Sequence, residues 1–533
     1  MIETSLPTSW ERPQIDVCCD LNPRLDKAAI ADSRLVHFVP MPAVEALTNK
    51  VDVKATRPFA EVKKGYTPFL SGDVIFAKIT PCMENGKVAV VPDLEHDIAL
   101  GSTEFHVIRP LCDLPPLWFF YYLSSRAYRS EAEHNMTGAV GQRRVPIDFI
   151  AQSKIPLPPL AEQRRIVAKI EELFSELDAG EESLRRARRQ LGVYRQSLLK
   201  QAFEGKLTAP WRENHPDLLE SPDQLLARIA AARDALYQKE LEDWKRDLQC
   251  WEDALKTGKR PSKPRQPEEP DPPSTEHRRR QWEIPTSWAW TQVGFPFYVT
   301  KLAGFEYTEF VTYDDTGDLK VLKAENAGPE GFRHTQFSRV HSESVAMLTR
   351  SVVSGGDLLV VFVGNTGNVA TVPFGDSFFL GPNIGMARSY TEFVNTRYVE
   401  LFLRSPSGRD MLLAAAKAVA QPSLSMGTIR QCLLALPSLP EQREIVRLLD
   451  EQFTVIEQNE REIDAALKRS AALRQSILKK AFTGQLVPQD PTDEPASALL
   501  ERIRAEREAT AILTKPQKKV AKKKISRNRA KYL

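Results

Sequence analysis

Three stretches of the sequence hold residue types that could perform chemistry. Phe362–Gly367 is a glycine-containing loop of the kind that binds the cofactor of methyltransferases. Asp271–Ser274 resembles the Asp-Pro-Pro-Tyr motif of enzymes that methylate amino groups. Pro222–Asp223 and Asp243–Lys245 together resemble a loose nuclease signature. These stretches decide whether the chain is expected to be an enzyme.

The elements that would position these residues do not fit catalysis. A cofactor loop leads from a strand into a helix, but the β-branched run Val369–Val372 predicts that the chain returns as a hairpin. Asp271–Ser274 lacks the aromatic residue that would stack on a base, and both nuclease-like pieces fall on one predicted helix. The sequence has no GxxxxGK[ST] phosphate-binding motif. We therefore expect no catalytic residues in this chain.

The cysteines do not form a metal-binding pattern. None belongs to a CxxC pair or has a histidine at ligand spacing, and two are adjacent, which suits neither zinc nor an ordinary disulfide. We expect structural thiols, and neither a metal nor a cofactor bound by this chain. The six are Cys18, Cys19, Cys82, Cys112, Cys250 and Cys432.

Length and composition predict a multidomain cytoplasmic protein. The 533 residues exceed the usual size of one domain, and a hydrophobic content of 42% is sufficient for packed cores. No apolar stretch is long enough to cross a membrane. The N-terminal sequence lacks the basic and apolar regions of a secretion signal.

The net charge of +3 conceals a basic C-terminal segment. Lys515–Lys531 holds nine Lys and Arg residues and no acid, and without them the chain carries 64 basic and 70 acidic residues. A nucleic-acid partner would therefore have to be held by local patches. We interpret 515–533 as a disordered solubilising tail, with a DNA-binding arm as the alternative.

A repeated segment determines the predicted architecture. Leu160–Leu207 aligns without a gap with Leu439–Leu486, 279 residues later, and Glu162–Arg164 falls on Glu441–Arg443. Prolines precede both segments, acids lie in their first turns, and Gly205 and its copy follow them, as at the ends of helices. Each segment is predicted to be a helix about 65 Å long.

Both predicted helices carry an apolar seam with the 4,3 spacing of a coiled coil. Gly180 interrupts the first seam, and Asn459 is predicted at the matching position of the second, where a polar residue can determine register. Two copies of one stripe can pack on each other about a pseudo-two-fold axis. The alternative is two ordinary amphipathic helices on separate domains. The seam residues are Ile166, Ile170, Leu173, Leu177, Leu184, Leu191, Leu198, Ile445, Leu449, Ile456, Ile463, Leu473 and Ile477.

The segments between the helices are also duplicated. Leu6–Trp10 recurs as Ile284–Trp288, and alternating runs such as Leu35–Val39 predict strands, followed by a helix over Leu117–Ala132. The chain is thus an α+β protein built as a tandem repeat. Its predicted parts are a globular unit 1–157, a long helix 158–207, a helical connector with a Pro-rich linker 208–281, a second globular unit 282–436, a second long helix 437–486, a trailing helix 487–514 and the tail 515–533.

These motifs resemble the specificity subunit of type I restriction-modification systems. The resemblance rests on Ile155–Val167 and its copy Leu436–Val446, and on the helix ends Gln201–Leu207 and Lys480–Leu486. It covers nearly the whole chain and leaves out the basic tail. The family implies two α/β target recognition domains held apart by an antiparallel intramolecular coiled coil of the long helices. The long connector departs from the compact family pattern.

The resemblance also implies partners and a target. Double-stranded DNA, two methylation subunits and two restriction subunits are expected, with S-adenosylmethionine, ATP and magnesium bound by the partner subunits and no membrane involved. Because the two recognition domains differ in sequence, the DNA target should be bipartite and asymmetric. A helix of about 65 Å limits the separation of its two parts to about 20 base pairs, at about 3.4 Å per pair.

Direct readout of DNA requires hydrogen-bonding side chains on well-positioned loops. We expect these on the loop after Phe76 and the glycine loop near residue 140, and on the corresponding loops of the second domain. The candidates are Lys78, Thr80, Asn85, Lys87, Gln142, Arg143, Arg144, Asn365, Thr366, Asn368, Gln421 and Ser423. Two alternative functions remain at this point: a stand-alone bipartite DNA-binding regulator, and a coiled-coil scaffold for other proteins.

Overall fold

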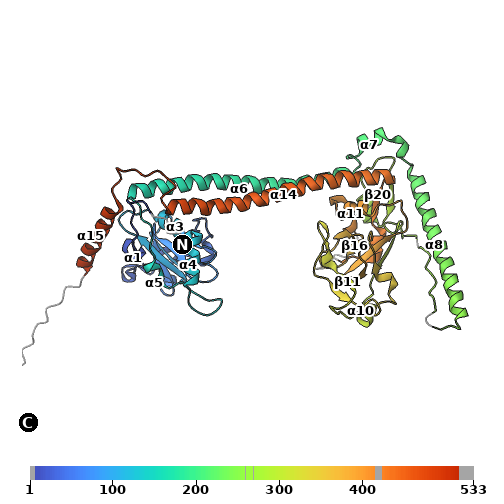
Figure 1. The fold of residues 1–533 in the computed structure, drawn as a ribbon, viewed down its shortest axis with the longest axis horizontal. Coiled ribbons are helices and arrows are strands. Elements are labelled where there is room, and N and C mark those ends of the chain that lie inside the picture. The colour runs from blue at the N-terminus through green and yellow to red at the C-terminus, as the bar shows by residue number, and fades with distance from the viewer. Residues whose placement is uncertain (1–5, 258–259, 268, 415–422, 515–533) are drawn as a thin grey trace, which may run out of the picture. The chain divides into compact units, whose positions relative to one another are not determined.

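The computed structural model describes residues 6–257, 260–267, 269–414 and 423–514. It divides into two compact units: unit 1 consists of residues 1–184 and 464–533, and unit 2 of residues 185–463. The division passes through both long helices, so each unit contains one globular domain and a part of each helix (Figure 1). The predicted tail and Gln421 lie outside the described residues.

Both long helices have the predicted bounds to within a few residues. They are α6 (Leu160–Phe203) and α14 (Leu439–Phe482), each of 44 residues. Gly205 and Gly484 follow them with φ of 72° and 73°, a backbone conformation that glycine adopts without strain. A Cβ atom at either glycine would collide with the ring of Pro285 or Pro7 of the same unit. These glycines therefore end the helices and allow each domain to pack closely.

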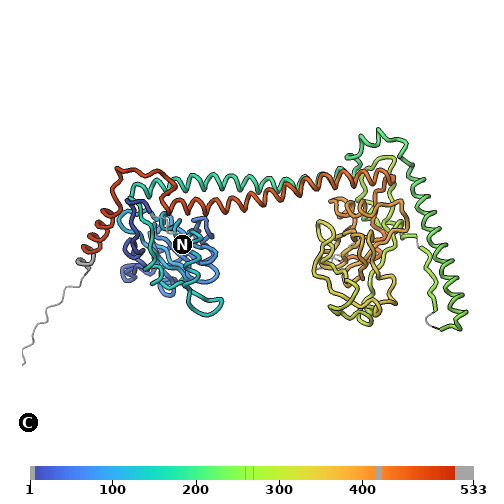
Figure 2. Tube along the Cα trace, viewed as in Figure 1, coloured from blue at the N-terminus to red at the C-terminus, as the bar shows by residue number. Residues whose placement is uncertain are grey.

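Within each unit the two helices run antiparallel. In unit 1, Ser470 donates a hydrogen bond of 2.7 Å to Glu181, and Arg474 donates one of 2.6 Å to Asp178. As the residue number increases along α6, the number of the contacting residue in α14 decreases, so the two helices are antiparallel. The trace in Figure 2 shows this return of the chain: the red end of α14 lies beside the first part of α6. In unit 2 the hydroxyl of Tyr194 donates to Gln452 over 3.3 Å in the same sense.

The seam follows a different frame from the predicted one near its centre. Leu473 is 51% exposed, whereas Arg474 beside it places its guanidinium 5.0 Å from the ring of Phe174. Asn459 is exposed as well, and Glu460 next to it is partly buried. The prediction was wrong at Leu473 and Asn459 because it admitted only apolar residues into the seam. A long arginine side chain can pack its stem on an aromatic ring while its charge pairs with a glutamate.

The remaining predicted seam residues are covered. Fully buried are Ile166, Ile170, Leu198, Ile445, Leu449, Ile456 and Ile463, and partly buried are Leu173, Leu177, Leu184, Leu191 and Ile477. In unit 2 an arginine again takes the place of the neighbouring apolar residue in the seam. Tyr194 is 46% exposed, whereas Arg195 lies 5.3 Å from the ring of Phe453 and 3.6 Å from Glu460.

The two globular domains share one topology of two four-stranded sheets. In unit 1 the first sheet is β1 (Cys19–Leu21), β8 (Phe105–Pro110), β5 (Val74–Ala77) and β6 (Val88–Val90), and the second is β3 (Thr56–Pro58), β2 (Leu35–Val39), β7 (Ile98–Gly101) and β4 (Thr67–Leu70). In unit 2 the corresponding sheets are β10 (Phe297–Lys301), β19 (Ile384–Ser389), β16 (Leu358–Val361) and β17 (Val369–Thr371), and β14 (Ser338–Val340), β11 (Leu319–Leu322), β18 (Phe378–Leu380) and β15 (Val352–Val353). In each domain the first sheet is antiparallel, and the second contains one parallel pair, β2 with β7 or β11 with β18.

Smaller elements complete the two domains. Two-stranded sheets join β12 (Ala327–Gly328) to β13 (Gly331–Phe332) and β9 (Ala289–Gln292) to β20 (Leu433–Leu436). The short helices are α1 (Ile15–Cys18), α2 (Phe59–Val62), α5 (Ile147–Gln152), α7 (Ala209–Asn214), α9 (Thr275–Arg279), α10 (Gly304–Phe310) and α13 (Met426–Gln431). Single turns of 3-10 helix lie at Lys27–Ala29, Met41–Ala43, Pro216–Leu218, Ala324–Asn326 and Thr349–Ser351.

Alternation along the central strand builds two cores in each domain. Val74 and Phe76 of β5 point into the core shared with α3 (Pro116–Ser124) and the long helices, whereas Ile75 and Ala77 point into the core between the two sheets. The strand β16 of unit 2 divides its side chains in the same way. All four residues of each strand are buried, which explains why both read as continuous apolar runs.

The helix predicted over Leu117–Ala132 is two helices. α3 ends at Ser124 and α4 (Arg126–His134) begins after Ser125, whose hydroxyl accepts a hydrogen bond from the backbone N–H of Tyr128. The serine has extended backbone angles, so it interrupts one helix and caps the next. In unit 2, Ser405 separates α11 (Thr396–Arg404) from α12 (Pro406–Leu413) in the same way.

A trailing helix follows each long helix and packs on the domain of its own unit. Leu225 and Ile229 of α8 (Pro222–Asp253) are buried in the core of unit 2, and α15 (Ala496–Thr514) buries Leu499 and Ile503 in unit 1. The predicted cap at Ser221 is present as a capping box. Both nuclease-like pieces lie on α8, as the sequence predicts, so they do not form a hairpin.

Each domain is fastened to the start of a long helix by the same buried hydrogen bond. The indole N–H of Trp10 donates to Glu162 over 2.9 Å, and that of Trp288 donates to Glu441 over 3.0 Å. All four residues are buried. The repeated Trp and Glu-Gln motifs of the sequence therefore meet in space, and they attach a domain to each helix.

No helix among the described residues is long and apolar enough to span a membrane.

The helix pair of unit 2 offers a direct test of the seam. Leu191 packs against the core of unit 2, so Leu191→Asp should lower the free energy of unfolding by about 2–4 kcal/mol, because a carboxylate would replace a half-buried apolar side chain. Val193, two residues further along the helix, is 71% exposed. Val193→Asp should therefore change the free energy of unfolding by no more than about 0.5 kcal/mol. Thermal melting of both variants checks this. Equal stability of the two would contradict the seam.

Candidate nucleic-acid interface

Two loops of unit 1 that are distant in sequence form one surface. The loop between β5 and β6 and the loop at residues 137–144 exchange backbone hydrogen bonds. The N–H of Thr80 donates to the carbonyl of Arg143 over 3.0 Å, and the N–H of Val145 donates to that of Lys78 over 2.9 Å. Thr137 and Arg144 pair with each other at the base of the second loop. The structure thus brings together the loops in which the sequence predicts readers of DNA bases.

Three of the predicted side chains on this surface are available to a ligand. Asn85 and Gln142 are exposed, and Lys78 is partly buried. Within the part of the chain that the structure describes, none of the three makes a side-chain hydrogen bond or ion pair. An amide group offers both a donor and an acceptor, as the edge of adenine requires.

The other four predicted residues of unit 1 hold the loops in place. Thr80 donates to Glu84 over 3.0 Å, and Lys87 donates to the carbonyl of Met41 over 2.9 Å. Arg143 lies 3.4 Å from Glu84. These contacts stiffen the loop and leave Thr80 and Lys87 less able to turn toward a base.

Arg144 neutralises a second acid beside this surface, in addition to Glu84. It donates two hydrogen bonds of 2.9 Å to the two carboxylate oxygens of Glu104. This bidentate pair is the main reason why the pKa of Glu104 lies below its ordinary value. The carboxylate therefore stays ionised, and its charge is balanced locally. A polyanion can approach the loops without meeting an uncompensated acid there.

An arginine that the sequence analysis missed supports each loop from behind. Arg129 of α4 donates to the carbonyl of Glu84 over 2.6 Å, and Arg409 of α12 donates to the carbonyls of Thr366 and Gly367 over 3.1 Å each. Each arginine stands four residues after the capping serine of its helix. That recurring Ser-x-x-x-Arg spacing was the available signal.

The corresponding surface of unit 2 has fewer free side chains. Asn365 is exposed, but Thr366 and Asn368 are each only 8% exposed, and Asn368 donates to the carbonyl of Ala327 over 3.1 Å. These two side chains shape the loop, and their role as base readers stays a prediction. Ser423 is partly buried beside the loop, because the N–H of Leu424 donates to the carbonyl of Phe362 over 3.1 Å.

His106 anchors the end of the second loop of unit 1. Its Nε2 lies 2.9 Å from the carbonyl of Val145, and its Nδ1 lies 3.3 Å from the amide nitrogen of Asn22. A neutral ring protonated at Nε2 satisfies both contacts, since Nε2 donates and Nδ1 accepts. Burial is the main cause that lowers the pKa of His106 below its ordinary value.

Neither the cysteines nor the acids assemble a metal centre in the described ranges. No group of three or more His, Cys, Asp or Glu side chains there could hold a metal ion. Cys18, Cys19 and Cys432 are buried thiols, and burial raises the pKa of Cys18 to about 12. A thiol with so high a pKa is protonated and unreactive at neutral pH.

Comparison with known proteins identifies similar chains. Residues 8–184 match the type I restriction modification DNA specificity domain. The specificity subunit of the type I restriction enzyme EcoAI of Escherichia coli is 26% identical over 475 residues, covering 84% of this chain and 78% of that protein. The EcoKI specificity subunit of Escherichia coli strain K12 is 24% identical over 518 residues, covering 89% and 96%.

Two solved structures share the fold. A chain from a study of complex assembly and conformational transition of the type I R-M system aligns with a TM-score of 0.64 at 18% identity, covering 90% of this chain and all of that one. The crystal structure of the HsdS subunit from Thermoanaerobacter tengcongensis aligns with a TM-score of 0.52, also at 18% identity, covering 91% and 99%. The predicted fold class, with two α/β domains and packed long helices, is confirmed.

The state of His106 predicts how stability depends on pH. Its pKa in the folded protein lies below the value of about 6.5 of an unfolded chain, so the neutral ring favours the folded state above about pH 6.5. This contribution is lost as the pH falls below that value. Between about pH 7.5 and about pH 5.5 the wild type should therefore lose more thermal stability than His106→Gln. Exposed His134 provides the control variant His134→Gln, which should follow the wild type. The same pH dependence in all three proteins would contradict this role.

Proposed function

We propose that the chain is a specificity subunit of a type I restriction-modification enzyme and that it reads a bipartite, asymmetric DNA target with one recognition domain in each unit. It is the non-catalytic, DNA-recognising subunit of such a system. The duplication of the domain is the observation that supports a bipartite DNA target. Two domains with the same strand topology expose different side chains from the same loop position.

The loops supply the chemistry of recognition. In unit 1 the loop after β5 exposes Asn85, and the loop paired with it exposes Gln142. In unit 2 the equivalent loop exposes Asn365, with buried Thr366 and Asn368 holding its shape. Amide side chains can pair with two atoms of one base edge, so different amides on two rigid loops would select different bases. This difference supports an asymmetric target.

The partner subunits supply the catalysis. We infer that the chain acts with methylation and restriction subunits, and its similarity to specificity subunits of type I restriction enzymes supports this. We further infer two subunits of each kind, matched to the two units, and a complex that works in the cytoplasm. S-adenosylmethionine, ATP and magnesium would be bound by those subunits. Adenine methylation and ATP-dependent cleavage would follow wherever this chain places them on DNA.

Methylation mapping tests the proposal most directly. The chain should be co-expressed with the methylation subunit of its own host, and methylated adenines mapped by single-molecule sequencing. We expect one motif of two unequal blocks, methylated on both strands, which disappears when this chain is deleted. A pattern unchanged by deletion would refute the proposal and favour a stand-alone regulator or a scaffold.

The loop residues predict which half of the motif each unit reads. The double variant Asn85→Ala with Gln142→Ala should relax the methylated motif in one block only, at a cost of about 1–3 kcal/mol in discrimination. Asn365→Ala in the equivalent loop of unit 2 is the matched variant and should affect only the other block. Sequencing of methylated sites from both strains provides the readout. Loss of the same block in both variants would contradict the assignment of one block to each unit.

A further inference from the structure

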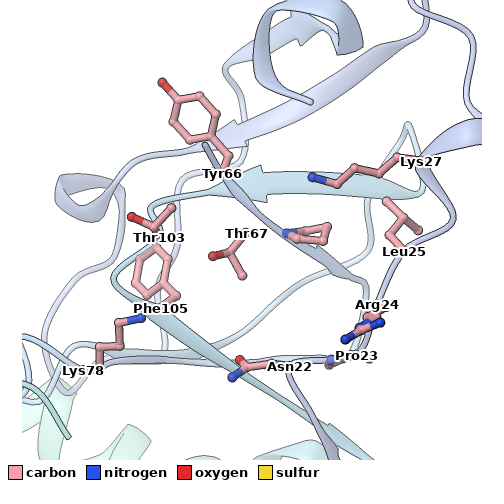
Figure 3. Close-up of a pocket in the computed structure, with 11 residues that line it drawn as sticks. Asn22, Pro23, Arg24, Leu25, Lys27, Tyr66, Thr67, Lys78, Thr103 and Phe105 are labelled. Carbon is pink, nitrogen blue, oxygen red and sulfur yellow. The ribbon is translucent and has the colours of Figure 1, made fainter. Parts of the chain in front are cut away.

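The globular domain of unit 1 contains a hollow to which the recognition loops contribute Lys78. Its volume is about 370 Å³, and it is bounded by the segment after β1, the first residues of β4, and residues at the ends of β5 and β8 (Figure 3). Both sheets of the domain therefore contribute to its wall. A space of this size is sufficient for a phosphate group with part of a sugar.

The hollow is lined by three cations. Arg24, Lys27 and Lys78 belong to its wall, and none of the described residues that line it is Asp or Glu. Figure 3 shows Lys27 and Lys78 reaching in from opposite sides, with the hydroxyl of Thr67 between them. Lys27 donates to the carbonyl of Lys63 over 2.7 Å, which leaves its charge unbalanced. In the described part of the chain, Arg24 and Lys78 have no side-chain partner.

Two acids adjoin the lining residues. Asp26, next to Lys27, caps the turn Lys27–Ala29 by accepting from the N–H of Ala28 over 3.1 Å. Glu104 stands between Thr103 and Phe105, which both line the hollow, but Arg144 binds both of its carboxylate oxygens. Lys78 also contributes to the low pKa of Glu104, so the three cations outnumber Asp26, the adjoining acid that Arg144 does not pair. Such a site favours a ligand with a negative charge and several acceptor oxygens, as a phosphate has.

The hollow shares a wall with the recognition surface. The backbone of Lys78 bonds to the carbonyl of Glu104 over 2.9 Å on one side and to the N–H of Val145 over 2.9 Å on the other. Its side chain enters the hollow, while its loop continues toward Asn85. A DNA strand whose bases face the loops would thus place its backbone beside the hollow.

We propose that this hollow binds a single backbone phosphate of the target DNA and so determines the register of the duplex on the recognition loops of unit 1. The proposal rests on the DNA-reading function proposed above. Phosphate contacts carry no sequence information, but they orient the duplex so that the same base edges always meet the same side chains. Arg24 and Lys27 are therefore positioning residues.

The domain of unit 2 differs at the corresponding positions, where Lys301 at the end of β10 places its amino group 5.3 Å from the ring of Phe362. The residue that follows β16, where Lys78 follows β5, is Phe362, and it is buried. On the helix that follows β10, Glu306 forms an ion pair of 2.5 Å with Arg350. The phosphate contact should therefore belong to one half of the DNA target.

The test uses the full chain assembled with its methylation subunit. Arg24→Ala with Lys27→Ala removes two exposed cations of the hollow, and Lys50→Ala with Lys54→Ala removes two exposed lysines elsewhere on the same domain. Affinity for the target duplex is measured against salt concentration and with a neutral methylphosphonate placed at each phosphate in turn. Arg24→Gln with Lys27→Gln, which preserves side-chain bulk, is the second variant if the alanine pair does not fold.

We expect one phosphate at which the neutral substitution weakens wild-type binding about tenfold and has no further effect on the Arg24 and Lys27 variant. In that variant the slope of log affinity against log salt should decrease by about one, with an unchanged methylated motif. The lysine control should keep the wild-type sensitivity at that phosphate.

Two results would overturn the assignment. In the first, the variant keeps the phosphate sensitivity of the wild type. In the second, adenosine monophosphate binds to the wild type and not to the variant while the methylphosphonate pattern is the same in both, which would make the hollow a site for small nucleotides. A wild-type complex without any sequence preference would instead refute the proposed function.

Discussion

The buried hydrogen bond between a tryptophan and a glutamate at the start of each long helix is the contact on which the rest of the structure depends. Trp10 with Glu162, and Trp288 with Glu441, tie the first residues of each globular domain to the helix that follows that domain. A buried carboxylate is costly unless donors satisfy it. Glu162 also accepts from Gln489 over 2.5 Å, and Glu441 from Arg212 over 2.5 Å. Each domain is therefore held rigidly on its helix.

The helix pair combines apolar packing with a few polar contacts that select its register. Apolar residues alone would allow the two similar stripes to slide by one turn at modest cost. In unit 1, Arg474 pairs with Asp178 and packs on Phe174, and in unit 2, Arg195 lies beside Glu460 and Phe453. A one-turn shift would separate these groups and leave partly buried charges unpaired. The register of the helices within each unit depends on these contacts.

The loop surfaces of the two units show how one topology can present different side chains. Supporting contacts recur between the units: Arg129 and Arg409 hold the loop carbonyls, and Asp73 with Arg109 forms the same ion pair as Asp357 with Arg388. The tips of the loops differ, and in unit 1 three cations line a hollow beside them. The scaffold is thus retained while the side chains that its loops expose change.

The sequence by itself determined the duplication, the bounds of the long helices, the hairpin after Phe362 and the loops that form the recognition surface, because these follow from local periodicity, glycine and proline positions and repeats. It did not determine which polar residues enter the seam, that Thr366 and Asn368 are buried, or that Arg24 and Lys78 share one hollow. Those features depend on which segments meet in three dimensions. Burial and charge pairing are decided by neighbours distant in sequence, and only the tertiary structure specifies them.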